Sequence, residues 1–223
     1  MENLNKKVVL LVGLIGSGKS TLLEELEACG AAVIRMDDLW KQRIYTELFR
    51  KSLKNIFGED VLYADGSPRI TTIRNLLFSR RKEDRQICLE RQTNLFKAFS
   101  DIFVDIVNEE IWVQLANPAV TMVILESATA LMADWHSKLA PIRTVALHCN
   151  EKIRLTRLLK RNTEIDTATY LAIMQMQQSD HELLKVSTDI GAINCYTECS
   201  VAEMKQKARD LYKQLQCSDT VLT

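Results

Sequence analysis

Glycine and proline are scarce in this chain: its 223 residues include seven glycines and three prolines. Both residues interrupt regular structure, so their scarcity favours long helices and excludes a collagen-like or loop-dominated protein. No charge of one sign dominates either, since 29 basic residues balance 29 acidic ones. An even balance gives no overall attraction to nucleic acid or to an anionic membrane, and no interleaving of basic and aromatic residues suggests a nucleic-acid-binding face.

Metal-binding and membrane-spanning patterns are also missing. None of the six cysteines belongs to a CxxC pair, and no histidine lies at zinc-ligand spacing from the one close pair, Cys195 and Cys199. The apolar run at residues 8–15 is too short to span a bilayer, and the polar residues before it do not form a signal peptide. We therefore expect reduced thiols in a cytoplasmic protein without a membrane anchor.

Short apolar runs alternate with helical patterns along the chain. Residues 8–12 and 31–34 have the composition of buried strands and flank a helical segment at residues 20–29. Further strands are expected at residues 120–125, 144–148 and 189–194, and helices at residues 151–160, 166–178 and 201–215. This alternation predicts an α/β fold, a three-layer sandwich around a parallel five-stranded sheet.

A long helical block separates the second predicted strand from the third. Helical patterns cover residues 39–57 and 71–115, and residues 58–68 between them have the composition of a loop. We expect the block to form a helical acceptor-binding insertion at about residues 39–116. The whole chain, residues 1–223, would then be a single domain.

The sharpest motif is GLIGSGKS at residues 13–20, which matches the phosphate-binding pattern GxxxxGK[ST] in full. A buried strand precedes it and an amphipathic helix follows, as this loop requires, which makes a purely structural glycine turn the weaker interpretation. Glycines let the backbone turn its N–H groups toward an anion, and the start of the helix adds a partial positive charge. The loop predicts a P-loop NTPase that binds ATP and Mg²⁺.

The residues expected to bind the nucleotide are Gly13, Gly16, Ser17, Gly18, Lys19, Ser20 and Thr21. Lys19 is expected to act on the β- and γ-phosphates and is counted among the catalytic residues, and Ser20 is expected to bind Mg²⁺ through its hydroxyl. The base-reading Asn-Lys-x-Asp motif of GTPases is absent. A sheet with an inserted helical lobe fits a small-metabolite kinase.

Within that group the chain resembles the dephospho-CoA kinase family over most of its length. Residues 13–21 (GLIGSGKST) are similar to the family's loop, and residues 33–39 (VIRMDDL) to its strand-end segment, with Asp37 at the family's aspartate. Phe57-Gly58, Asp65-Gly66-Ser67 and Phe78 follow at similar spacing. Residues 157–161 (RLLKR) resemble the lid segment, and Gln175, Asp189 and Asn194 fall on the closing pattern.

This resemblance implies transfer of the ATP γ-phosphoryl group to the ribose 3′-hydroxyl of dephospho-CoA. It implies a lid at about residues 155–180 in which Arg161 acts in catalysis and Arg157 binds the nucleotide, and it places Asn194 at the adenine pocket. Three departures lie on the acceptor side. Ile70 occupies the family's arginine position, no His-Pro pair occurs on the long helix, and residues 127–130 (SATA) replace Pro-Leu-Leu.

Several candidate residues have a second interpretation. Asp37 follows the second strand, where ligands bind in open α/β sheets, and could act on the acceptor hydroxyl or cap a helix; Asp38 is the better cap. Glu126 ends the third strand and could hold a water on Mg²⁺ or pair with a local partner.

The arginines have a second interpretation as well. Arg157 and Arg161 could instead belong to a solvated basic face with Arg154 and Lys160. Arg69 and Arg74 are candidates for acceptor phosphates. A kinase for another small acceptor and a nucleotide-binding regulator without activity remain alternatives.

Overall fold

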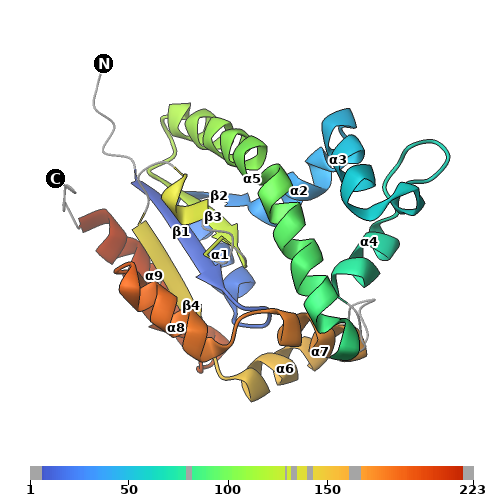
Figure 1. Cartoon of the computed structure of the whole chain (residues 1–223). Helices are drawn as coiled ribbons and strands as arrows, with labels where there is room; N and C mark the ends of the chain where they lie inside the picture. The colour runs from blue at the N-terminus through green and yellow to red at the C-terminus, as the bar shows by residue number, and fades with distance from the viewer. Residues whose placement is uncertain are drawn as a thin grey trace.

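The computed structural model describes residues 7–78, 82–128, 130–131, 135–139, 143–160 and 167–217 (Figure 1). Five parallel strands form one sheet in the order β2-β3-β1-β4-β5. The strands are β1 (Lys7–Gly13), β2 (Ala31–Arg35), β3 (Met122–Ser127), β4 (Arg143–His148) and β5 (Ile193–Tyr196). The predicted α/β fold with a parallel five-stranded sheet is confirmed.

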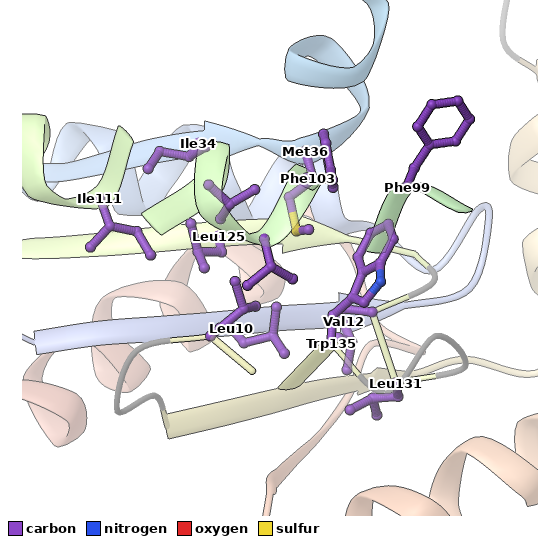
Figure 2. Close-up of a cluster of buried hydrophobic side chains, with 14 of the residues drawn as sticks. Leu10, Val12, Ile34, Met36, Phe99, Phe103, Ile111, Leu125, Leu131 and Trp135 are labelled. Carbon is purple, nitrogen blue, oxygen red and sulfur yellow. The ribbon is translucent and has the colours of Figure 1, made fainter. Parts of the chain in front are cut away.

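Helices cover both faces of the sheet, because neighbouring residues of a central strand point to opposite sides. On one face Val9 and Leu11 of β1 pack against α1 (Lys19–Ala28) and α9 (Val201–Cys217). On the other face Leu10 and Val12 belong to a core shared with α5 (Arg85–Ala116) and α8 (Asp180–Asp189). Figure 2 shows this second core, with sheet residues on one side and α5 residues on the other. The molecule therefore has the three predicted layers.

The block between β2 and β3 is helical, as expected, but it is divided differently. It contains α2 (Met36–Arg43), α3 (Glu47–Phe57), α4 (Ile70–Leu77) and α5, with short 3-10 turns at Glu59–Val61 and Lys82–Asp84. In Figure 1, α2, α3 and α4 lie to the right of the sheet and α5 crosses from the sheet to this lobe.

A single helix at residues 39–57 was the wrong expectation. The chain turns at Thr46, whose backbone is extended and whose hydroxyl donates to the Arg43 carbonyl (2.8 Å). The turn lets Phe49 of α3 stack on Phe99 of α5, with ring centroids 4.4 Å apart. Tertiary packing of the aromatic rings thus overrides a helical pattern that reads as continuous.

The C-terminal third contains one helix that the pattern missed. α6 (Glu151–Lys160), α7 (Thr167–Met176) and α9 correspond to predicted helices, whereas α8 begins in residues for which no element was predicted. Ser179 and Glu182 form a capping box at its start. α8 includes Asp189, so β5 begins only at Ile193 rather than at residue 189.

None of the six cysteines forms a disulfide bond. Among the described residues, no helix combines the length and the apolar composition that crossing a membrane requires.

Candidate functional site

A cleft of about 740 Å³ opens at the carboxyl end of the sheet. One wall is the loop at residues 15–20, which leaves β1. The floor carries Asp37, just after β2, and Glu126, near the end of β3. The opposite wall comes from α2, α4 and α5 of the helical lobe. The parallel sheet thus brings three predicted site segments to one edge, as open α/β sheets do.

The loop wraps around the start of α1. β1 ends at Gly13 and α1 begins at Lys19, with Gly18 as its N-cap. Gly16 and Gly18 have φ angles of 80° and 96°, a region that residues with a Cβ adopt at a cost. Gly16 also lies so close to α6 that a Cβ would be 2.8 Å from the Arg154 carbonyl oxygen. The glycine at this position is therefore required twice, by conformation and by space.

Three consecutive carbonyls of the loop are held from behind. Arg154 donates to the Ile15 carbonyl (3.2 Å), Arg157 donates to the Gly16 carbonyl (3.5 Å), and the Thr197 hydroxyl donates to the Ser17 carbonyl (2.7 Å). The N–H groups of Gly16 and Gly18 have no hydrogen-bond partner within the described part of the chain. Because its carbonyls are hydrogen-bonded on one side and two of its N–H groups remain available as donors, the loop can bind an anion.

Lys19 lies between the loop and the strand end. Its ammonium donates to the Gly13 carbonyl (2.8 Å) and lies 3.6 Å from the Glu126 carboxylate. Burial raises the pKa of Glu126, the Lys19 charge opposes that rise, and the charge of Asp37 adds to it. Glu126 therefore has a local partner, Lys19, as one of its two interpretations expected. It also lines the cleft, where the other interpretation would have it hold a water on Mg²⁺.

The residues present fit a magnesium-bound nucleotide better than a bare ion. No cluster of three or more His, Cys, Asp or Glu side chains within the described ranges could hold a metal alone. Mg²⁺ usually takes only one or two protein carboxylates and completes its shell with phosphate oxygens and water. Ser20 and Glu126 both line the cleft and could supply the protein's share once phosphates are bound.

Asp37 and Asp38 lie in the first turn of α2, which begins at Met36. The N-cap is Arg35, and no side chain caps it, so both capping interpretations are wrong. Asp38 instead accepts a hydrogen bond from Lys41 at 2.8 Å, and this bond raises the pKa of Lys41. Asp37 is exposed, lines the cleft and forms no hydrogen bond or ion pair with another described side chain, so its carboxylate is available to a ligand.

Other predicted residues lie elsewhere. Asn194 does not line the cleft. Its side-chain oxygen is instead hydrogen-bonded to His148 and to Ser187, each at 2.8 Å. Arg157 lies behind the loop, where it also donates to the Thr197 carbonyl (2.6 Å). Arg161 falls outside the described residues.

The two candidate acceptor arginines are separated by the structure. Arg74 lines the cleft from α4. Arg69 does not, since its guanidinium lies 4.8 Å from the centroid of the Tyr63 ring. Of the two, Arg74 is placed to meet a ligand in the cleft.

Three residues around the loop were missed or misjudged from the sequence. Arg154 was named only as part of an alternative solvated basic face, but only 3% of it is exposed. Gln177 accepts the Ile15 N–H at 3.0 Å, whereas the family pattern pointed to Gln175. Thr197 is fully buried, and nothing in its local sequence marked it. These contacts join segments distant in sequence, so local patterns do not reveal them.

A family model and a curated relative both match this chain to dephospho-CoA kinases. The dephospho-CoA kinase family model matches residues 7–195. A dephospho-CoA kinase of Dehalococcoides mccartyi is 23% identical over 192 residues, which cover 86% of this chain and 91% of that protein.

Two solved structures share the fold. TT1252 from Thermus thermophilus has a TM-score of 0.68 and 21% identity, with 94% of this chain and 98% of that chain covered. A dephospho-CoA kinase from Campylobacter jejuni has a TM-score of 0.57 and 14% identity, with 95% and 98% covered.

Proposed function

Because the chain belongs to the dephospho-CoA kinase family, a family of ATP-dependent kinases, we propose that it transfers the γ-phosphoryl group of ATP to the ribose 3′-hydroxyl of dephospho-CoA. The observation that carries the proposal is the convergence on one cleft of the loop at residues 15–20, Asp37 and the helical lobe. Donor and acceptor groups bound on opposite walls would meet at the sheet edge, which suits in-line transfer.

On the donor side, the loop N–H groups and Lys19 would hold the nucleotide phosphates. Bound Mg-ATP supplies the phosphoryl group and a cation that neutralises its charge. Ser20 and Glu126 are the protein groups proposed to hold that cation. Lys19 lies 3.6 Å from Glu126, so the group proposed to hold the phosphates and the group proposed to hold the cation are neighbours in the cleft.

On the acceptor side, Asp37 is proposed to accept or orient the proton of the attacking hydroxyl. Its exposure in the cleft leaves room for that hydroxyl. Apolar side chains of α4 and α5, among them Ile73, Leu77 and Phe96, would contact the uncharged arm of the substrate. Arg74 lies on the same wall and would pair with the substrate's diphosphate.

The remaining roles rest on family resemblance. Arg161 is proposed to close over the transferring group from the lid, and Arg157 and Asn194 to support nucleotide binding. Neither Arg157 nor Asn194 lines the cleft. Arg157 would therefore act through its hydrogen bond to the Gly16 carbonyl of the loop, and Asn194 through its hydrogen bond to His148. Six cysteines without a disulfide bond favour a reducing compartment, so we propose the cytoplasm.

The test is to incubate the protein with Mg-ATP and dephospho-CoA and to detect coenzyme A by mass. Lys19→Ala and Asp37→Asn are each expected to reduce the rate by about 10²–10⁴-fold, the usual range for a charge or base in the transition state. Asp38→Asn is the matched control, because its carboxylate pairs with Lys41, and it should keep most of the activity. Asp37→Asn should still bind Mg-ATP in calorimetry.

Wild-type protein that binds Mg-ATP but makes no coenzyme A would overturn the proposed acceptor. Equal losses in Asp37→Asn and Asp38→Asn would instead remove the specific role of Asp37.

A further inference from the structure

Arg154 is an unusual residue to find behind a phosphate loop. Its side chain comes from the first turn of α6, and only 3% of the residue is exposed. A buried guanidinium is costly unless its N–H groups are satisfied. Here each of its nitrogens has a partner: Nε donates to the Cys149 carbonyl (3.1 Å), Nη1 to the Ile15 carbonyl (3.2 Å) and Nη2 to Asp180 (3.2 Å).

The contact with Ile15 fixes the direction of a particular peptide. The carbonyl of Ile15 and the N–H of Gly16 belong to one planar trans peptide, so they point in opposite directions. Arg154 holds the carbonyl on the outer side of the loop, and the Gly16 N–H, which has no partner among the described residues, is turned the other way.

Ile15 is held by other groups of the same region as well. Its N–H donates to Gln177 (3.0 Å), and its side chain packs against a cluster of Leu158, Tyr170 and Met174 from α6 and α7. Asp180, at the start of α8, supplies the counter-charge that makes the burial of Arg154 tolerable. The loop is therefore anchored at one residue by α6, α7 and Gln177, and α8 supplies the counter-charge of Arg154.

We propose that Arg154, held in place by Asp180, is a positioning residue that orients the peptide between Ile15 and Gly16 so that the Gly16 N–H faces the phosphates of ATP. The inference rests on the proposed use of ATP by this loop. It adds a role for an ion pair that has no contact with the cleft itself. Neutralising the pair should weaken nucleotide binding through the loop and leave acceptor binding unchanged.

The test measures Mg-ATP affinity by calorimetry and stability by urea unfolding in the same variants. Arg154→Met keeps most of the stem and removes the donors, and we expect Mg-ATP to bind about tenfold more weakly, the effect of one lost interaction. Arg154→Lys keeps the charge and should recover part of the affinity. Arg209→Met is the control, because Arg209 pairs with Glu25 between α9 and α1 and neither residue lines the cleft, so affinity should be unchanged.

The double variant Arg154→Met/Asp180→Asn separates positioning from stability. Arg154 is buried but the Asp180 side chain is 32% exposed, so removing both charges should restore the stability that Asp180→Asn alone costs by leaving the buried guanidinium unpaired. If Arg154 positions the loop, the double variant recovers stability and still binds Mg-ATP weakly. Affinity that returns together with stability, or that is unchanged in Arg154→Met, would overturn the proposal.

If Arg154→Met does not fold, the Mg-ATP affinities of Arg154→Lys and Asp180→Asn still test the proposal. Asp180→Asn should weaken Mg-ATP binding less than Arg154→Met, because the guanidinium can still reach the Ile15 carbonyl, and equal affinity in Arg154→Lys and wild type would overturn the need for the fork of donors. Because the readout is nucleotide affinity, it does not depend on whether dephospho-CoA is the acceptor.

Discussion

Gly16 offers a sharp test of the loop geometry, because replacement by alanine has two separable costs. The φ angle of 80° would be strained for alanine by about 1–2 kcal/mol. The new Cβ would lie 2.8 Å from the Arg154 carbonyl oxygen and 3.1 Å from its Cα, a backbone collision that a rotamer change cannot relieve. Overpacking of this kind adds about 1–3 kcal/mol. We therefore expect Gly16→Ala to lower the free energy of unfolding by about 2–5 kcal/mol.

Gly191 is the matched control for the conformational part. Its φ angle is 69°, and a Cβ there would meet no atom within 4 Å. Gly191→Ala should therefore cost only the strain of about 1–2 kcal/mol. The difference between the two variants, measured by equilibrium urea unfolding, isolates the collision with α6.

Nucleotide affinity completes this test. Since α6 cannot move without displacing the buried Arg154, the loop itself should shift, and Mg-ATP should bind to Gly16→Ala at least about tenfold more weakly. Gly191→Ala should bind it normally. Equal stability losses in the two variants, together with unchanged affinity in Gly16→Ala, would refute the close approach of loop and helix.

Two further predictions concern charges in the cleft. Burial raises the pKa of Glu126 above its ordinary 4.5, so the folded state holds that proton more tightly than the unfolded chain. The free energy of unfolding should fall as pH rises from 4.5 through the raised pKa. Glu126→Gln should make this fall smaller. The prediction is contradicted if urea unfolding at a series of pH values gives the same pH dependence of stability in both proteins. Arg74→Gln should raise KM for dephospho-CoA about tenfold with KM for ATP unchanged, since Arg74 alone of the two candidate arginines lines the cleft. Arg69→Gln, which removes only a contact with Tyr63, should leave both constants unchanged, and equal effects of the two substitutions would refute the assignment.

The sheet and the phosphate loop were predictable because their signals are local. β1 is a short β-branched run that ends in a glycine-rich segment. The glycines of GLIGSGKS permit the loop conformation, so the motif itself predicts it. The positions of Asp37 and Glu126 followed from the rule that ligands bind where parallel strands end. In each case a few neighbouring residues carry the information.

What the sequence could not supply depends on contacts between distant segments. Arg154 sits among charged residues that indicate an exposed helix face, yet Ile15 and Asp180, far away in sequence, make it a buried anchor. The break at Thr46 reflects aromatic packing between α3 and α5 rather than local helix propensity. α8 is a different case, because the capping pair Ser179 and Glu182 was present in the sequence and would have revealed it.

The most direct measurement is to supply Mg-ATP with dephospho-CoA or with its 3′-deoxy analogue and to follow both product mass and ATP consumption. We predict that dephospho-CoA gains one phosphoryl group while ATP is consumed in equal amount, and that the analogue, which lacks the hydroxyl, gains none. Phosphorylation of the analogue, or no product from either compound while Mg-ATP still binds, would contradict transfer to the 3′-hydroxyl in this cleft.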